Sequence, residues 1–205
     1  MGMYRNLGKR MLDLVVIVPV AIGVCPLMLL VSLMIRLKLG SPVIFRQPRA
    51  GLNGSVFTVY KYRTMTNATD ENGELLPDDE RLPPFGRLLR RLSLDELPQI
   101  WNVLRGDMGL VGPRPLLTEY LNRYSPIQAR RHEVTPGVTG WAQVNGRNTL
   151  SWEDRFEMDV WYVDNGNLWL DLKILWRTFT NVVRRKDVSA AGHVTMPKFT
   201  GSDLK

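Results

Sequence analysis

The feature that most constrains this chain is a run of 22 residues without a charged side chain, from Leu14 to Ile35. As a helix this run would be about 33 Å long, which is enough to cross the hydrocarbon core of a bilayer. A signal peptide is a poor alternative, because its apolar segment would be shorter and a small-residue cleavage site should follow it. Here Arg36, Leu37 and Lys38 follow instead. The run therefore predicts a membrane segment near the start of the chain.

The residues around and within this run bear on how it sits in the membrane. Basic side chains stand on both sides of it, at Arg5, Lys9, Arg10, Arg36 and Lys38. Positive charge prefers the cytoplasmic side, so both ends favour the same side. Pro26 lacks a backbone donor and disfavours helical geometry at Cys25, and we expect a break at this pair. These features favour a re-entrant helix–break–helix over residues 1–40. A kinked helix that spans the bilayer is the alternative.

The remainder of the chain predicts one catalytic domain over residues 41–186 and a polar C-terminal tail over residues 187–205. The 205 residues carry a net charge of +7, which points to an anionic partner such as a phosphorylated small molecule, a nucleic acid or a membrane surface. A single cysteine excludes an intramolecular disulfide framework and a cysteine-rich zinc site. No phosphate-binding P-loop motif is present, and the two histidines are isolated from each other.

Local patterns predict a fold of the α/β class, mainly helical with a small β-hairpin. The segments Val43–Gln47 and Ser55–Tyr62 are rich in β-branched and aromatic residues, and a glycine-containing loop joins them. Two amphipathic helices are expected, one after Pro84 and one from about Asp171 to Arg185, the second with Trp169 and Trp176 as candidate headgroup anchors. Each helix could lie in the membrane interface or pack its apolar face on the core.

The acidic pair Asp95-Glu96 stands directly after a basic segment and within Ser93-Leu-Asp-Glu-Leu-Pro-Gln. An ordinary interpretation is a capping box, with Ser93 as N-cap and Glu96 three positions later, of a helix that Gly106 ends. A functional interpretation uses the same helix start: it attracts phosphate and keeps Asp95 ionised as a nucleophile, while Glu96 holds a divalent cation. The spacing alone leaves both interpretations open.

Basic and polar residues in loops ordered by glycine and proline are further candidates for phosphate binding. Arg114 lies between two prolines in Gly-Pro-Arg-Pro, and Pro136-Gly-Val-Thr-Gly predicts a tight turn. Each such arginine is more often a solvated surface charge, but their joint placement favours a site. The candidates are Lys61 and Arg63 at the end of the predicted hairpin, Arg114 with Pro115, and Arg147, which follows Gln143 and an Asn-Gly turn.

Seven segments, in this order along the chain, resemble those of the bacterial sugar transferases, also called monotopic phosphoglycosyl transferases. They are Lys9-Arg10-x-x-Asp13, Lys61–Met65, Ser93–Gln99, Asn102–Met108, Gly112–Pro115, Pro136–Gly140 and Gln143–Arg147. The short chain and the segments Asn72–Pro77 and Ser151–Glu153 are similar to those of the small PglC-type members.

This resemblance implies a reaction at the cytoplasmic face of a bacterial inner membrane. A sugar 1-phosphate would pass from a UDP-sugar, UDP-di-N-acetylbacillosamine or a related N-acetylated sugar, to undecaprenyl phosphate, a polyprenol phosphate, with release of UMP. Asp95 would be the nucleophile that forms a phosphosugar-aspartyl intermediate, and Glu96 would ligate Mg²⁺. A UDP-hexose, used to start capsule or O-antigen synthesis, is one alternative. Another is a membrane-anchored anion-binding protein without catalysis, in which the two carboxylates only cap a helix.

The resemblance also implies further site residues and partners. The family's other site residues correspond to Lys61, Arg114 with Pro115, Asp159 and, as a phosphate contact, Arg147. The family breaks its re-entrant helix at a Ser-Pro pair, and Cys25-Pro26 takes its place here, so the bend would depend on the proline and the charged flanks. Membrane lipid is an expected partner and a homo-oligomer stays open. A nucleic-acid partner is not expected, because the chain has an apolar run and no recognition motif.

Overall fold

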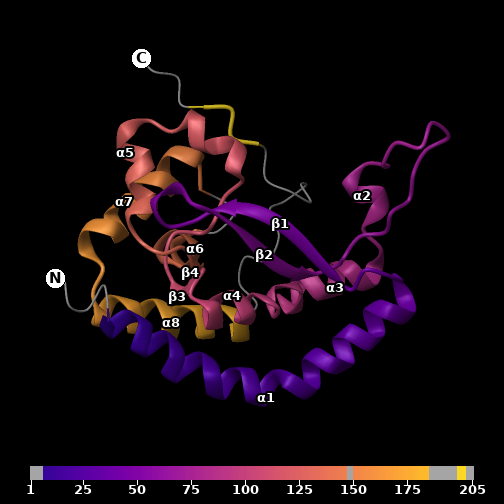
Figure 1. Ribbon diagram of the computed structural model, residues 1–205, viewed down its shortest axis with the longest axis horizontal. Helices are drawn as coiled ribbons and strands as arrows, with labels where there is room; N and C mark the ends of the chain where they lie inside the picture. The colour runs from indigo at the N-terminus through magenta and orange to yellow at the C-terminus, as the bar shows by residue number, and fades with distance from the viewer. Residues whose placement is uncertain (1–6, 147–149, 185–197, 202–205) are drawn as a thin grey trace.

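One long helix runs beneath the rest of the protein. The computed structural model describes residues 7–146, 150–184 and 198–201, and in it α1 (Lys9–Lys38) is a single helix of 30 residues. Figure 1 shows α1 as an arc whose two ends rise toward the other elements. The helix continues through Cys25 and Pro26, so the predicted break is a bend within one helix. A proline removes a single backbone hydrogen bond and kinks the helix, while the turns on either side keep theirs.

The first turns of α1 are held to the protein by buried polar contacts. Lys9 Nζ forms a 2.8 Å ion pair with the Asp171 carboxylate of α8 (Leu168–Arg184). Four residues later, Asp13 Oδ1 accepts a 2.9 Å hydrogen bond from the backbone N–H of Leu110 in β3 (Gly109–Val111). Because these charges are buried, they must be paired, and the pairs fix the position of this end of α1.

The last turns of α1 are held to the same body of the protein. Ile35 is fully buried, and Tyr62 packs in the same cluster. The Tyr62 hydroxyl donates to the Met28 carbonyl at 2.8 Å and lies 3.0 Å from the Ser32 hydroxyl. Between its two fixed ends, α1 exposes large apolar side chains, among them Val20, Ile22, Leu29 and Leu30. Among the described residues, only α1 is long and apolar enough to cross a membrane.

The predicted β-hairpin is confirmed. β1 (Ile44–Ala50) pairs antiparallel with β2 (Val56–Tyr62), and Ile44 is opposite Tyr62. The first strand ends three residues later than predicted, because Pro48 is accepted in a two-stranded ribbon, where both strands are edges. Gly51 and the short 3₁₀ turn η2 (Leu52–Gly54) connect the strands. The hairpin places Lys61 and Tyr62 beside the C-terminal half of α1.

A second small sheet replaces a predicted turn. The segment Pro136–Gly140 is not a tight turn: β4 (Gly137–Thr139) pairs parallel with β3. A Cβ atom on Gly137 would lie 2.1 Å from the backbone nitrogen of Gly112, so glycine is needed for the close approach of two backbones. The Pro-Gly pattern is typical of turns, but here the segment forms a strand because it pairs with β3, which is distant in the sequence.

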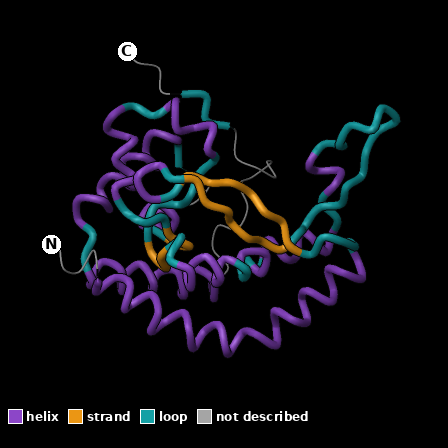
Figure 2. The backbone as a smooth tube through the Cα atoms, viewed as in Figure 1, coloured by secondary structure: helices purple, strands orange, loops and turns teal. Residues whose placement is uncertain are grey.

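Helices and loops make up the rest of the described residues (Figure 2). The remaining α-helices are α2 (Asp78–Arg81), α3 (Pro84–Arg91), α4 (Gln99–Arg105), α5 (Pro126–Ala129), α6 (Trp141–Asn145) and α7 (Trp152–Asn165). The 3₁₀ turns are η3 (Leu94–Glu96), η4 (Thr118–Arg123) and η5 (Arg130–Glu133). The fold is therefore α/β and mainly helical, as predicted.

The two predicted amphipathic segments form α3 and α8, which lie with α4 along the inner side of the α1 arc (Figure 1). Each buries part of its apolar face, through Leu89 in α3 and Ile174 in α8. Other apolar side chains of α8 stay outside the core, and Trp169 and Trp176 are 79% and 66% exposed. The packing interpretation is therefore confirmed for part of each helix. The interfacial interpretation stays a prediction, for which the exposed tryptophans of α8 are the suitable side chains.

A third cluster involves the end of the chain. Phe199 is buried and its ring lies 5.0 Å from that of Phe156 in α7 and 5.6 Å from that of Tyr120 in η4. Its backbone N–H also donates to the Tyr120 hydroxyl at 3.2 Å. Among the described residues of the predicted polar tail, 198–201, Phe199 is thus an apolar anchor.

Candidate active site

The acidic pair lies in a 3₁₀ turn and not in the first turn of a helix. Asp95 and Glu96 belong to η3, and α4 begins three residues later at Gln99, directly after Pro98. Ser93 is in the left-handed region, with φ 54°, and its side chain caps nothing. The capping-box prediction is therefore wrong. Pro98 explains the later start, because proline suits the entry to a helix but cannot continue one from its N-terminal side. Gly106, with φ 91°, ends α4 as predicted.

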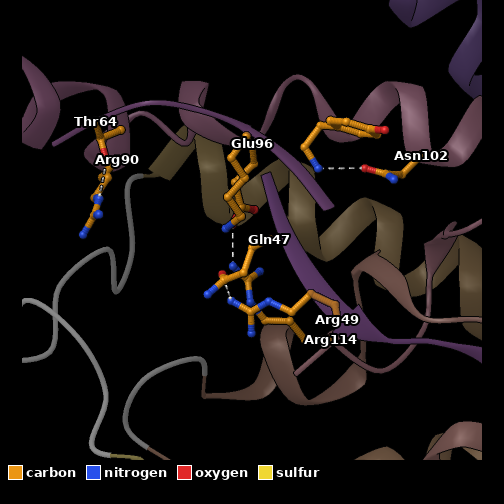
Figure 3. A network of polar contacts seen from close by, with 9 residues as sticks. Gln47, Arg49, Thr64, Arg90, Glu96, Asn102 and Arg114 are labelled. Carbon is orange, nitrogen blue, oxygen red and sulfur yellow. Dashed lines mark hydrogen bonds and ion pairs between the residues drawn. The ribbon is translucent and has the colours of Figure 1, made fainter. Parts of the chain in front are cut away.

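The carboxylate of Glu96 is held by two cations from separate parts of the chain. Lys61 Nζ at the end of β2 donates to Glu96 Oε1 at 2.8 Å, and Arg114 Nη2 donates to the same oxygen (Figure 3). Burial alone would raise the pKa of Glu96, but Arg114 and Lys61 outweigh it and hold that pKa well below its usual range. Burial lowers the pKa of Lys61, and Glu96 opposes this shift. Glu96 is therefore ionised and fixed in position.

Asp95 has a different environment from its neighbour. Within the described residues its carboxylate has no hydrogen bond or ion pair. Burial and then the charge of Glu96 raise the pKa of Asp95, while Lys61 and Arg90 oppose the shift. The pair lies in η3 and not at a helix start, so the helix-start argument for an ionised Asp95 does not apply, and its ionised state stays a prediction. Asp95 thus presents oxygen atoms that no neighbouring donor occupies.

Asn102 attaches α4 to the hairpin next to the site. Its side-chain amide donates to the Thr58 carbonyl at 2.7 Å. Its side-chain oxygen accepts from the Tyr60 backbone N–H at 3.1 Å, the bond drawn at Asn102 in Figure 3. These two bonds fix the strand that carries Lys61 against the helix that follows Glu96. The other end of α4 contacts α1, since Arg10 donates to two carbonyls in its last turn at 2.5 and 2.7 Å. The long apolar helix α1 is thus connected to the acidic turn by α4.

Arg114 is supported from behind by a buried ion pair. Arg131 Nη2 in η5 donates to the Arg114 carbonyl at 2.8 Å. The Arg131 guanidinium also donates twice to one oxygen of Asp159 in α7, at 2.7 and 3.0 Å. Asp159 is 2% exposed, and its carboxylate faces Arg131. Asp159, a site residue that the resemblance implies, thus holds Arg131, which in turn contacts the loop of Arg114 and Pro115. A substrate contact of Asp159 stays a prediction.

Other predicted site residues lie away from the acidic pair or cannot be placed. Arg63 donates to the Met65 carbonyl at 2.8 Å and to the Ser41 carbonyl at 2.6 Å, so it fixes the turn between α1 and the hairpin. Gln143 lies in α6, and both polar atoms of its side chain are buried without a hydrogen-bond partner among the described residues. Arg147 is outside the described residues, so its predicted phosphate contact stays a prediction.

Two basic residues of the site region were not predicted from the sequence, and a third belongs to the basic segment noted directly before the acidic pair. Arg49 lies in β1 near Arg114, and Arg131 supports the Arg114 loop as described above. Arg90 of α3 donates to the Thr64 hydroxyl at 3.0 Å, and its positive charge opposes the upward shift of the Asp95 pKa. Arg90 stands in a basic segment that also suits a membrane surface. Nothing in the local pattern separates Arg49 or Arg131 from the other basic residues of the chain, because pairing of distant segments brings them here.

The donor set fits a magnesium ion that is shared with a phosphorylated substrate. Oxygen ligands are what Mg²⁺ prefers, and proteins often bind it through one or two carboxylates, with water and substrate phosphate at the other positions. In the described part of the chain, Oε2 of Glu96 and both Asp95 oxygens have no hydrogen-bond donor. The same residues contain no group of three or more acidic, histidine or cysteine side chains that could hold a metal without a substrate.

Comparison with known proteins adds to this geometry. The family model described as bacterial sugar transferase matches residues 4–185. The Bacillus subtilis (strain 168) protein named "Uncharacterized sugar transferase EpsL" is 55% identical over 194 residues, which are 95% of this chain and 96% of that protein. The Komagataeibacter xylinus "Undecaprenyl-phosphate glucose phosphotransferase" is 43% identical over 84% of this chain and 35% of its own length. The Salmonella typhimurium "Undecaprenyl-phosphate galactose phosphotransferase" is 38% identical over 86% of this chain and 40% of its own length.

Proposed function

Because the chain belongs to the bacterial sugar transferase family, we propose that it transfers a sugar 1-phosphate from a UDP-sugar to undecaprenyl phosphate and releases UMP. The observation that carries the proposal is the contrast within the acidic pair. Lys61 and Arg114 both bind Glu96, while the neighbouring Asp95 carboxylate has no partner in the described part of the chain. A carboxylate without donors beside two fixed cations is suited to attack a phosphorus atom whose oxygens those cations can neutralise.

The proposed chemistry has two displacement steps at one phosphorus atom. An ionised oxygen of Asp95 attacks the phosphorus that bears the sugar, and the bond from that phosphorus to the bridging oxygen breaks. UMP leaves with the bridging oxygen, and the phosphosugar stays on Asp95. An oxygen of undecaprenyl phosphate then attacks the same phosphorus, which frees the Asp95 carboxylate and forms the lipid diphosphate sugar. A covalent intermediate lets a soluble nucleotide and a membrane lipid use one site in turn.

The residues around Asp95 would stabilise charge during both steps. Mg²⁺ bound at Glu96, with Asp95 beside it, would supply positive charge to the oxygens of the transferring phosphoryl group. Lys61 and Arg114 hold the Glu96 carboxylate in one orientation and are themselves cations next to the reacting centre. Burial is the largest cause of the raised pKa of Asp95. A carboxylate that is less solvated is a stronger nucleophile once it is ionised.

We further infer that α1 enters and leaves the membrane by one face, with the catalytic domain on the cytoplasmic side of the inner membrane. Support comes from the attachment of both ends of α1 to the same domain, through Lys9 with Asp171 and through Met28 with Tyr62. A helix that spanned the bilayer would have to release one of these ends. The exposed apolar middle of α1 would then insert into one leaflet, and the exposed aromatic side chains of α8 would lie at the interface.

This topology is tested with single cysteines at the two ends of α1. Cys25 is the only cysteine in the chain, so a Cys25→Ser background carries either Leu7→Cys or Leu37→Cys, both at exposed positions. A maleimide that cannot cross membranes is added to sealed inside-out and right-side-out vesicles. We expect both cysteines to react in inside-out vesicles and neither in the other preparation. Reaction of the two cysteines from opposite sides would show a spanning helix.

The proposed sugar is an N-acetylated one, such as di-N-acetylbacillosamine, because the short chain resembles the small PglC-type members. A hexose is the second candidate, since relatives of this chain are named for transfer of glucose and of galactose. A panel of UDP-sugars with undecaprenyl phosphate and a UMP-release assay separates the two. A preference of tenfold or more in kcat/KM for glucose or galactose would overturn the N-acetylated assignment and leave the reaction class intact.

The reaction class itself is tested at Asp95. With a UDP-sugar labelled in its β-phosphate and no lipid acceptor, the native chain should release about one UMP per site and keep the label covalently bound. Asp95→Asn should do neither, because an amide is a poor nucleophile. Asp79→Asn is the matched control, since Asp79 is an exposed carboxylate in the short helix α2 (Figure 1) and is not part of the proposed site. Undiminished label on the Asp95→Asn chain would refute the proposed nucleophile, and no label on the native chain would favour the non-catalytic anion-binding protein.

A further inference from the structure

The inference concerns Arg49, which pairing of the hairpin with a distant segment brings beside Arg114. Near the end of β1, the Ala50 backbone N–H donates to the Leu116 carbonyl at 3.1 Å, and Arg49 forms an isolated β-bridge with Leu117. The strand that carries Arg49 thus runs beside the segment that follows Arg114. Figure 3 shows the Arg49 and Arg114 side chains gathered with Gln47 on the side of Glu96 that Arg114 contacts.

Arg49 is half-buried and, unlike the fully buried Arg131, is not paired with a carboxylate. Arg131 is paired with Asp159, whereas Arg49 Nη2 donates to the neutral Gln47 side chain at 2.5 Å. No ion pair joins Arg49 to any acidic residue within the described ranges. A half-buried charge without a counter-charge is costly, and here a like charge stands beside it. Burial and then Arg114 lower the pKa of Arg49 to about 10, so it is still a cation at neutral pH.

The charges around the acidic pair do not balance without a ligand. Two carboxylates face four cations, which are Arg49, Lys61, Arg90 and Arg114. The excess of positive charge matches the charge of a diphosphate or a phosphate monoester. A guanidinium presents a planar fork of donors that fits two phosphate oxygens, and only one contact of the Arg49 fork is taken by Gln47.

We propose that Arg49 binds a phosphate group of a substrate and that Gln47 is its positioning residue. The inference rests on the proposed function, because it names a residue that binds a phosphate group of one of that reaction's substrates. The shared chemistry is a phosphate oxygen, which either the diphosphate of the nucleotide sugar or the phosphate of the lipid can present. Gln47 and Arg49 lie on the same face of β1, since residues two apart along a strand point to the same side.

The experiment compares Arg49→Gln and Arg49→Lys with Arg46→Gln as a matched control. Arg46 is an exposed arginine on the same strand, and its guanidinium lies over the Tyr60 ring at 5.9 Å. Calorimetry with UDP measures nucleotide binding directly, and turnover at saturating UDP-sugar gives the KM for undecaprenyl phosphate. Charge-assisted hydrogen bonds contribute about 1.5–3 kcal/mol. Arg49→Gln should therefore either weaken UDP binding or raise the KM for undecaprenyl phosphate, by about 10- to 100-fold. Arg49→Lys should recover part of the loss, and Arg46→Gln should change neither.

The two readouts separate the sources of the phosphate. Weaker UDP binding assigns Arg49 to the nucleotide, and an unchanged UDP affinity with a raised KM for the lipid assigns it to the acceptor. Unchanged values for both would overturn the inference. Gln47→Glu is a second variant that keeps the strand intact and offers Arg49 a carboxylate. Because this carboxylate would compete with the phosphate, we expect Gln47→Glu to weaken binding of the same ligand as Arg49→Gln. An unaltered affinity in Gln47→Glu would also count against the inference.

Stability distinguishes a binding role from a structural one. Removal of a half-buried cation without a counter-charge should leave the melting temperature of Arg49→Gln unchanged or raised, whereas a structural arginine would lower it. The outcome is also independent of the test at Asp95. UDP binding that depends on Arg49 can hold even if Asp95→Asn keeps its label. Conversely, the Asp95 test can succeed while both Arg49 readouts stay unchanged.

Discussion

Asp95 and Glu96 are neighbours in one 3₁₀ turn, yet their pKa values move in opposite directions. Burial and the charge of Glu96 raise the pKa of Asp95. For Glu96, burial is outweighed by Arg114 and Lys61, and its pKa is lowered. Their different partners account for this, because both cations donate to Glu96 and the described residues offer Asp95 no donor. The site therefore holds one carboxylate that stabilises the fold when ionised and one that opposes it.

This contrast predicts stability changes of opposite sign. A raised folded pKa means that stability falls as pH rises through the interval above the ordinary value of 3.8, so Asp95→Asn should raise the melting temperature at pH 7. A lowered folded pKa contributes stability above the ordinary value of 4.5, and this is lost as pH falls through the folded pKa. Glu96→Gln should therefore destabilise the protein at pH 7, by about 1.5–3 kcal/mol for its charge-assisted bonds. Thermal unfolding in detergent measures both, and shifts of the same sign would contradict the prediction.

The pH dependence of the first half-reaction should follow Asp95. The nucleophile must be ionised, and its pKa is above 3.8, so the rate of UMP release without acceptor should rise with pH until Asp95 is fully ionised. Glu96 should not contribute to this limb, because its pKa is held well below the usual range. Rapid-quench measurements from pH 4 to pH 8 test this at saturating UDP-sugar. A rate that is already maximal at pH 4 would be inconsistent with a raised pKa at the nucleophile.

The buried pair of Lys9 and Asp171 should behave as one unit. Their side chains are 11% and 0% exposed, and the Tyr162 hydroxyl also donates to Asp171 at 2.7 Å. Lys9→Met leaves a buried carboxylate without its cation and should cost about 3–5 kcal/mol of unfolding free energy. The double variant Lys9→Met with Asp171→Leu should cost less than Lys9→Met alone, because Asp171 is no longer a buried carboxylate without its cation. Lys38→Met at the exposed end of α1 is the control, and strictly additive effects of the two changes would refute the coupling.

Asp159 should affect activity through Arg131 and not through substrate contact. Asp159→Asn leaves the Arg131 charge buried and should cost about 3–5 kcal/mol. In the double variant Asp159→Leu with Arg131→Met, stability should largely return, but UMP release should stay low because the Arg114 carbonyl has lost its donor. The control is Asp164→Asn. Asp164 lies in α7, like Asp159, and forms an exposed ion pair with Arg130, so its loss should cost less than about 1 kcal/mol of unfolding free energy. Full activity in the double variant would exclude the positioning role.

Local sequence patterns were sufficient for several elements of this fold. The β-branched and aromatic content of the hairpin, the apolar spacing of α3 and α8 and the glycine at the end of α4 are all local features, and each predicted element is present in the structure. The capping box is wrong for a reason that is also local, because Pro98 sets the start of α4 and Ser93 takes a left-handed conformation. The predicted turn at Pro136–Gly140 is wrong for a different reason, since β4 depends on a close approach to β3 that no local pattern contains.

The sequence by itself determined that this chain carries a long apolar segment and a motif set of the bacterial sugar transferases, with Asp95 and Glu96 as its acidic pair. Only the tertiary structure decided which groups surround that pair. Lys61 comes from the hairpin and Arg114 from the loop after β3, and Asp159 is held behind that loop by Arg131. The physical reason is that a pKa depends on burial and on charges within a few ångströms, and distant segments supply both. An amphipathic helix or a β-hairpin can be predicted from its own residues, whereas an electrostatic site forms only when distant segments come together.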